Sequence, residues 1–268
     1  MNRAAAANSF INDGPVNDGR MIDVPIIDVR DLRFAWQRSA GNVLDIDRFV
    51  VDAGERVFLQ GPSGSGKTTL LSILGAVARP NQGEVWINGT KVSALRGSVR
   101  DQFRVDQIGF LFQMFNLIPY LSPLQNVLLP CRFSARRNKS ASRERSLTEE
   151  ARRLLSQLGL SGKLVKQRAG NLSVGQQQRV AAARALIGSP ELIIADEPTS
   201  ALDADARINF LHLLFDECNR NGATILFVSH DRALADQFDR TVNLVDINHV
   251  HLTGSAGGMT NDMTRPGA

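Results

Sequence analysis

The chain has 268 residues, of which 43% are hydrophobic and 22% are charged, enough to bury the core of one α/β domain with a smaller subdomain. The net charge is only +4, and the densest basic run, residues 132–145, carries serine and asparagine between its cations, with Phe133 as its one aromatic residue. Nucleic acid is therefore not an expected partner. We expect this run to be a solvated surface segment, with a contact to anionic lipid headgroups as the alternative.

Apolar stretches in this chain are short. The longest, Leu192–Ala195 and Ala223–Val228, are strand-length and far below the ~20 residues that a bilayer span needs. Residues Met1–Phe10 hold an alanine cluster but lack the apolar core of a secretory signal. Cys131 and Cys218 match no metal or disulfide spacing. These observations predict a cytoplasmic chain.

Residues 1–24 and 253–268 are predicted to be flexible tails on either side of a domain spanning residues 25–252. The first tail contains Asn-Asp-Gly twice and has little apolar periodicity. From Pro25 onward, short apolar strand patterns alternate with helical ones, which predicts a parallel sheet with helices on its faces. Strands are expected at Ile26–Val29, Val43–Val50, Glu55–Gln60, Leu192–Ala195 and Thr224–Val228.

A mostly helical stretch covers about residues 120–187. Two helix starts are well marked within it, because Ser146 with Glu149 and Ser173 with Gln176 both fit a capping box. We therefore predict a helical subdomain inserted into the domain.

A glycine-rich segment between the third strand and a helix satisfies the Walker A pattern. It consists of Gly61, Pro62, Ser63, Gly64, Ser65, Gly66, Lys67 and Thr68, with Thr69 next. Its glycines leave backbone N–H groups free to wrap phosphates, and the helix N-terminus adds positive potential. Lys67 can reach the β- and γ-phosphates, and Thr68 can ligate Mg²⁺. An ordinary Gly/Ser turn is the alternative, since composition alone would give the pattern on the order of once in a hundred.

Two carboxylates follow the strand Leu192–Ala195 directly. The carboxyl edge of such a sheet is where α/β proteins bind ligands. Asp196 is predicted to support the Mg²⁺ shell and Glu197 to polarise the water that attacks the γ-phosphate. The two motifs together predict a site for a nucleoside triphosphate with Mg²⁺.

Residues 171–180 read Asn-Leu-Ser-Val-Gly-Gln-Gln-Gln-Arg-Val, which resembles the Leu-Ser-Gly-Gly-Gln signature of ATP-binding-cassette ATPases. The resemblance covers about residues 26–247. It implies an α/β P-loop NTPase core, with a mainly parallel sheet flanked by helices, an antiparallel β subdomain and an inserted helical subdomain. It also implies a homodimer in which Ser173, Gly175 and Gln176 of one copy cap the γ-phosphate of ATP held by the other. A serine at a helix N-terminus suits that role, because such an end attracts anions.

The remaining motifs follow in the order typical of the family. Gln113 resembles the Q-loop glutamine, which implies contacts with Mg²⁺ and the attacking water, and residues 114–120 would then face a partner permease. Asp203 resembles the D-loop aspartate that crosses the dimer interface. His230 resembles the switch histidine at the γ-phosphate, although a lone histidine is usually structural.

Two aromatic residues are candidates for stacking on the adenine base. One position of the signature also departs from the family pattern. Trp36 stands where the family has an adenine-stacking ring, with a core tryptophan and stacking by Phe34 as the alternatives. Val174 replaces the first glycine of the signature. Its side chain either crowds the partner's nucleotide or faces away from it, and we expect hydrolysis to be retained but slowed.

Residues 109–119 and 125–127 resemble the group of cassettes that serves lipoprotein release, macrolide-type export and cell division. Membership would imply a cassette on the cytoplasmic face of the inner membrane that powers a separate transmembrane permease, in export or in lipoprotein or lipid extraction. Ser200 and Ala201 depart from the Gly-Asn common in that group. The alternative is a regulatory cassette of the cell-division type, which moves a membrane partner without transport.

Overall fold

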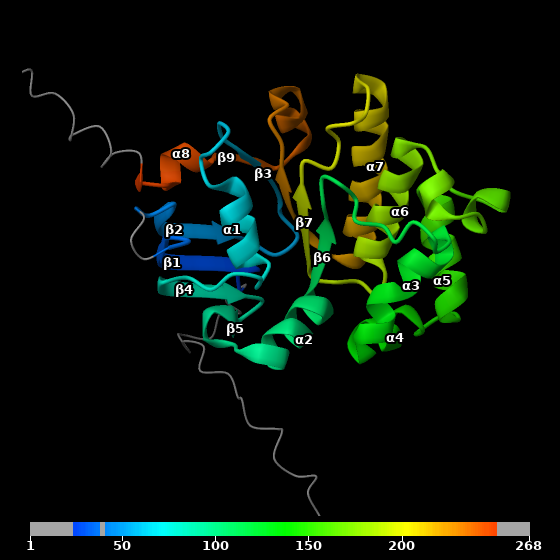
Figure 1. The fold of residues 1–268 in the computed structure, drawn as a ribbon, viewed down its shortest axis with the longest axis horizontal. Helices are drawn as coiled ribbons and strands as arrows, with labels where there is room; N and C mark the ends of the chain where they lie inside the picture. Colours follow the sequence, from blue (N-terminus) through cyan, green and yellow to red (C-terminus); the bar gives the residue numbers. More distant parts are fainter. Residues whose placement is uncertain (1–23, 38–40, 251–268) are drawn as a thin grey trace, which may run out of the picture.

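The computed structural model describes residues 24–37 and 41–250. The tails predicted at 1–24 and 253–268 lie outside these described residues, apart from Val24. Two sheets and a group of helices make up the described chain (Figure 1). The predicted α/β fold, with a parallel sheet, helices and a separate antiparallel sheet, is confirmed.

The central sheet is parallel, with the strand order β6-β7-β8-β3-β9. Its strands are β3 (Arg56–Gln60), β6 (Ile108–Leu111), β7 (Leu192–Asp196), β8 (Thr224–Val228) and β9 (Arg240–Asn243). Alternate residues of β3, β7 and β8 enter two different hydrophobic clusters, so that Phe58 lies in one and Leu59 in the other. Since both faces are covered, the inner strands β3, β7 and β8 are largely apolar instead of alternating with polar residues.

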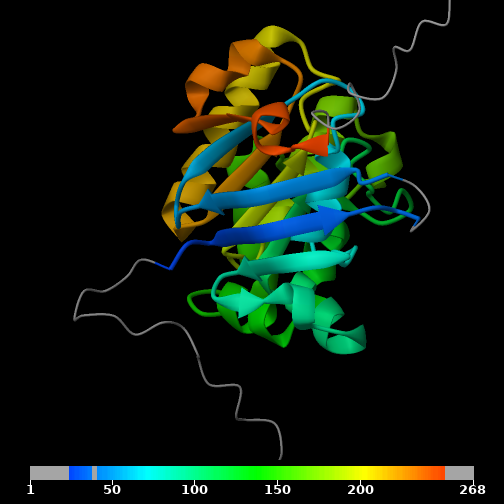
Figure 2. The ribbon, with the colours of Figure 1, turned by 90° about the vertical axis from the view of Figure 1, so that its left-hand side faces the viewer.

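The second sheet is antiparallel, in the order β2-β1-β4-β5, and Figure 2 shows its first three strands stacked as one layer. Its strands are β1 (Ile27–Phe34), β2 (Leu44–Val51), β4 (Gln82–Ile87) and β5 (Thr90–Lys91). The predicted first strand stopped at Val29, five residues too early, because Asp31 has a φ of 48° and the pairing with β4 shifts between Arg30 and Arg33. This bulge breaks the alternation that marks a strand in sequence. Gly83 faces it, where an added Cβ would lie 2.2 Å from the Asp31 carbonyl oxygen.

The helices cover the two faces of the parallel sheet. They are α1 (Lys67–Leu74), α2 (Gly97–Gln107), α3 (Pro123–Phe133), α4 (Ala135–Ala141), α5 (Leu147–Gln157), α6 (Val174–Leu186), α7 (Ala204–Asn221) and α8 (Leu244–Ile247). The buried leucines of α1 belong to the cluster shared with the antiparallel sheet, whereas α3, α5, α6 and α7 share the other. The structure therefore places α1 and α6 on opposite faces of the sheet (Figure 1).

Both predicted capping boxes are present. The Ser146 hydroxyl accepts from the Glu149 N–H at the start of α5, and the Ser173 hydroxyl accepts from the Gln176 N–H at the start of α6. Ser122 forms a third box at the start of α3, which the sequence reading did not single out. These boxes fix the helix starts in the segment between β6 and β7, because each satisfies backbone donors that the first turn leaves unpaired. In the described part of the chain, no helix combines the length and apolar composition that a membrane span requires.

The basic run 132–145 is not wholly solvated, which corrects the sequence-based expectation for Arg137. Its side chain is 2% exposed and donates to the carbonyl oxygens of Ile108 at 2.7 Å and of Ala185 and Ile187 at 3.3 Å. Burial lowers the pKa of Arg137 to about 10, so the guanidinium stays charged at neutral pH. The neighbouring Arg136 has a side chain 43% exposed and pairs with Glu191, as expected of a surface residue.

We predict that Arg137→Ala destabilises the fold by about 3 kcal/mol or more, because three buried carbonyl oxygens lose a charged donor. The matched variant Arg136→Ala removes a partly exposed ion pair and should cost less than about 1 kcal/mol. Urea unfolding of the two variants beside the wild type measures both values. Equal and small losses for both variants would contradict the structural role given to Arg137.

Candidate functional site

One edge of the parallel sheet collects most of the predicted site residues. Strands β6, β7, β8 and β3 run in the same direction, so their carboxyl ends lie at a common edge. Gln113 follows β6, Asp196 ends β7, His230 follows β8, and the glycine-rich loop leaves β3 at Gly61. The sequence therefore brings amide, carboxylate, imidazole and phosphate-binding backbone groups to one place.

The glycine-rich loop has the backbone of an anion-binding nest. Gly64 and Gly66 have φ values of 80° and 100°, a region that side chains disfavour, and α1 begins directly afterwards at Lys67. Lys67 is 7% exposed, and its ammonium donates to the carbonyl oxygens of Gly61 at 2.7 Å and Pro62 at 3.0 Å. The loop thus folds around its own lysine, with the first N–H groups of α1 directed at the same region.

The surroundings of the Ser65 hydroxyl indicate whether this loop fits a phosphate. The residue is 2% exposed, and its buried hydroxyl oxygen has no hydrogen-bond partner among the residues that the structure describes. A Cβ added at Gly61 would come within 2.8 Å of that oxygen, so a side chain there would displace the Ser65 hydroxyl. A buried polar atom normally has a partner, and a phosphate oxygen in the nest supplies one. Pro62, Ser63 and the Mg²⁺ candidate Thr68 are exposed, whereas Thr69 is 8% exposed.

Asp196, Glu197 and His230 lie together beside this loop. The His230 Nε2 atom is 2.5 Å from the Glu197 Oε1 atom, and the Glu197 N–H donates to the Val228 carbonyl oxygen at 2.9 Å. Glu197 has a φ of 45°, which is rare for a residue with a side chain and typical of functional positions. Burial, and then the neighbouring Glu197 carboxylate, raises the pKa of Asp196, while Lys67 and His230 act in the opposite direction. Helix α1, which begins at Lys67, contacts β7, which ends at Asp196, so the two motifs are neighbours in space.

Gln113 is exposed at the same edge, and a partly buried arginine holds the chain that follows it. Phe115 and Asn116 both have left-handed backbones, with φ values of 57° and 48°. The Arg184 guanidinium, from α6, donates to both of their carbonyl oxygens at 2.6 Å. Arg184 therefore links the turn after Gln113 to α6, the helix that Ser173 caps.

Trp36 is not a core residue. It is 62% exposed, and its ring meets the buried Phe34 ring edge-on at 5.0 Å between centroids. Phe34 is only 5% exposed, so stacking by Phe34 is not supported. Phe34 pairs with Leu44, and an added Cβ at Gly66 would lie 2.8 Å from the Leu44 side chain. The exposed tryptophan thus stands near the end of β1 that adjoins the phosphate loop.

The signature residues belong to a separate surface at the start of α6. Ser173 and Val174 are exposed, Val174 by 47%, so the valine side chain is not taken into the core of its own chain. An added Cβ at Gly175 would lie 3.4 Å from Leu202, just before Asp203, which caps α7 by accepting from the Ala206 N–H. Within residues 24–37 and 41–250, no hydrogen bond joins Ser173 to the phosphate loop.

Sequence reasoning missed two arginines that join these motifs. Arg207 donates to the Leu202 carbonyl oxygen at 2.8 Å and to the Asp231 carboxylate at 2.5 Å, which ties the predicted D-loop to the residue after His230. Arg184, described above, ties α6 to the turn after Gln113. Neither has a local sequence signal, because both bind backbone atoms or groups far away along the chain.

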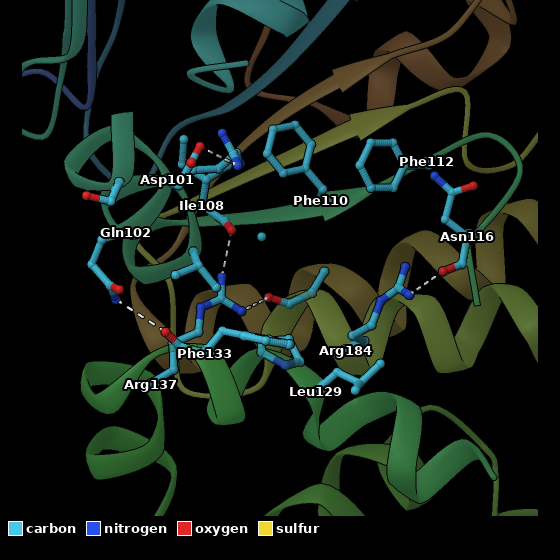
Figure 3. Close-up of a pocket in the computed structure, with 16 residues that line it drawn as sticks. Asp101, Gln102, Ile108, Phe110, Phe112, Asn116, Leu129, Phe133, Arg137 and Arg184 are labelled. Atoms are coloured by element: carbon cyan, nitrogen blue, oxygen red, sulfur yellow. Dashed lines mark hydrogen bonds and ion pairs between the residues drawn. The ribbon is translucent and has the colours of Figure 1, made fainter. Parts of the chain in front are cut away.

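A cleft of about 640 Å³ opens beside Gln113, between α2, β6, α3 and α6. Figure 3 shows Phe110 and Phe112 on one side and Leu129 and Phe133 on the other. The Phe112 side chain is 39% exposed and that of Phe133 is 69% exposed. Met114 and Tyr120, in the segment predicted to face a permease, are also largely exposed. The region therefore presents an unusual number of large apolar groups to its surroundings.

A glycine-rich nest between a parallel strand and a helix, with paired carboxylates at the same sheet edge, defines a P-loop NTPase. The family model described as ABC transporter matches residues 44–200, and the chain belongs to that family. It is an ATP-binding cassette, the ATP-hydrolysing subunit of a transporter.

Curated and solved relatives agree with this assignment. The lipoprotein-releasing system ATP-binding protein LolD of Syntrophotalea carbinolica is 42% identical over 199 residues, which cover 73% of this chain and 83% of the relative. The dimeric structure of the ABC transporter cassette MJ0796, of Methanocaldococcus jannaschii, is 36% identical with a TM-score of 0.71, covering 81% of this chain and 93% of that one. A post-hydrolysis dimer of MJ0796 bound to ADP and Pi is 34% identical with a TM-score of 0.68 and the same coverage.

We predict that Gly66→Ala weakens ATP binding about tenfold or more, because the left-handed backbone and the contact with Leu44 together cost about 1–3 kcal/mol of strain. Gly54→Ala is the matched control, since Gly54 has a φ of 77° but open space around it and lies outside the loop. Isothermal titration with ATP measures both affinities. Wild-type affinity in Gly66→Ala would show that the loop does not need this backbone.

Proposed function

We propose that two copies of this chain close around two molecules of ATP with Mg²⁺ and power a separate transmembrane permease from the cytoplasmic face of the membrane. The observation that carries the proposal is the exposed signature end of α6, which is not joined to the phosphate loop of its own chain. An anion-binding helix end without a ligand in its own chain can meet one in a second copy. The dimeric structure of the relative MJ0796 supports the same arrangement.

In the proposed site, the loop residues 61–69 hold the phosphates and Lys67 turns its ammonium from the loop carbonyls to the β- and γ-phosphates. Ser65 gains a phosphate oxygen as the partner of its buried hydroxyl. Trp36 stacks on the adenine base. Ser173, Gly175 and Gln176 of the second copy close over the γ-phosphate, and Asp203 lies at the boundary between the copies.

Mg²⁺ would be held by Thr68, Gln113 and Asp196, and it would neutralise charge on the β- and γ-phosphates. Glu197 is the proposed base that orients the attacking water. His230 holds the Glu197 carboxylate and is 58% exposed at its side chain, so it can also reach a γ-phosphate.

The cleft beside Gln113 is the proposed docking place for a cytoplasmic segment of the permease. Exposed aromatic side chains of the cleft suit an apolar partner surface, and Gln113 directly adjoins Phe112. Because Arg184 joins the turn after Gln113 to α6, a segment seated here would touch both the water-orienting site and the signature helix. The similarity to LolD favours lipoprotein release as the work that this permease performs.

We predict that Glu197→Gln binds ATP normally but accumulates as a closed dimer, because hydrolysis no longer reopens it. Size-exclusion chromatography with light scattering, with and without ATP and Mg²⁺, measures the change in mass. Glu191→Gln serves as the control, since Glu191 pairs with Arg136 on the surface. A monomeric Glu197→Gln protein with wild-type turnover would refute the role of Glu197 as base.

We predict that Phe133→Asp prevents co-purification with the permease from membranes, because it places a charge on the apolar rim of the cleft. Val245→Asp is the matched control on the far-removed helix α8, where the valine is 38% exposed. Melting temperatures establish that both variants are folded. Co-purification of Phe133→Asp at the wild-type level would show that the permease does not dock at this cleft.

A further inference from the structure

Asn248 is a buried polar residue that the proposed mechanism does not use. It follows α8 and is 1% exposed. Its Nδ2 group donates to the carbonyl oxygens of Val43 and Ser65, both at 3.1 Å, and its Oδ1 atom accepts from the Asp45 N–H at 2.8 Å. One side chain thus joins the end of the described chain, the start of β2 and the middle of the phosphate loop.

The contact with Ser65 determines how a neighbouring donor points. In a planar trans peptide, the C=O of one residue and the N–H of the next point in opposite directions. Since Asn248 holds the Ser65 carbonyl, the Gly66 N–H of the same peptide is directed to the other side. Gly66 has a φ of 100° and directly precedes α1, so this N–H belongs to the nest that receives phosphates.

The other two contacts anchor Asn248 to the rigid antiparallel sheet. The Val43 N–H donates to the Phe34 carbonyl oxygen at 2.7 Å, so the backbone held by Asn248 is also the backbone that closes the β1–β2 pair. The His249 N–H donates to the Asp45 carbonyl oxygen at 2.8 Å, which secures the segment from its other side. The carboxamide therefore has a fixed position from which to hold the loop.

We propose that Asn248 is a positioning residue that orients the Ser65–Gly66 peptide so that the Gly66 N–H is presented to the phosphates of ATP. The inference rests on the proposed function only for the identity of the ligand. A carboxamide fits this place because both donor hydrogens and the acceptor oxygen are used at once. A carboxylate of the same shape would keep the contact with Asp45 and turn both donor contacts into repulsion between oxygen atoms.

The test is the kinetics of ATP hydrolysis by the full chain carrying Asn248→Asp. We expect the KM for ATP to rise about tenfold or more, because a hydrogen bond to a charged phosphate is misdirected. The value of kcat at saturating ATP should fall much less than the KM rises, since neither Glu197 nor Asp196 is touched. ADP, as a competitive inhibitor, should lose affinity by a similar factor.

Asn126→Asp is the matched control for a merely structural effect. Asn126 is fully buried, and its Oδ1 accepts from the Ile118 N–H while its Nδ2 donates to the carbonyl oxygens of Ile118 and Ser122. The same substitution therefore imposes the same oxygen repulsion far from the phosphate loop. We expect a lower melting temperature in both variants but a raised KM only in Asn248→Asp.

Two results would overturn the inference: an unchanged KM in Asn248→Asp, or an equal rise in both variants. If Asn248→Asp does not fold, Asn248→Ala carries the test, because it removes the Nδ2 group and both of its donor contacts without adding charge. Lys67→Ala in the same assay distinguishes a failure of the proposed function from a failure of the role given to Asn248. A wild-type chain without ATP hydrolysis, or a Lys67→Ala variant as active as wild type, would refute the proposed function rather than the role of Asn248.

Discussion

Four parallel strands end at one edge of the sheet, and the proposed base, metal ligands and phosphate loop all follow one of those ends. Strand β3 leads into the loop, β7 into Asp196 and Glu197, β8 into His230 and β6 into Gln113. Helices on both faces keep these strands buried. Polar side chains can therefore gather at the edge of the sheet without being buried and left without hydrogen-bond partners. The common direction of the strands is therefore what brings the residues of the proposed site together.

The same architecture agrees with the proposal that one copy holds only part of each ATP site. Helix α1 carries the phosphate loop on one face of the sheet, and α6 carries the signature on the other. The arginine contacts join motifs that lie apart in the sequence: Arg184 joins α6 to the turn after Gln113, and Arg207 joins Leu202 to Asp231.

Features that depend on local sequence were predictable. The Walker A loop, the strand before Asp196 and both capping boxes follow from neighbouring residues, and the structure contains them. Features that depend on distant residues were not. The burial of Arg137 arises from carbonyl groups of β6 and of the α6 terminus, the full length of β1 is hidden by the bulge at Asp31, and α2 has no buried face to give it apolar periodicity. The role proposed for Asn248 likewise rests on contacts across about two hundred positions of sequence.

The central claim is that each ATP is enclosed by the phosphate loop of one copy and the signature of the other. A crystal structure of Glu197→Gln with ATP and Mg²⁺ tests it most directly, through the position of Ser173 relative to the γ-phosphate. The account predicts a two-fold dimer with the partner's Ser173 hydroxyl at hydrogen-bond distance, about 3 Å, from a γ-phosphate oxygen. A closed complex in which all γ-phosphate contacts come from one copy would contradict it.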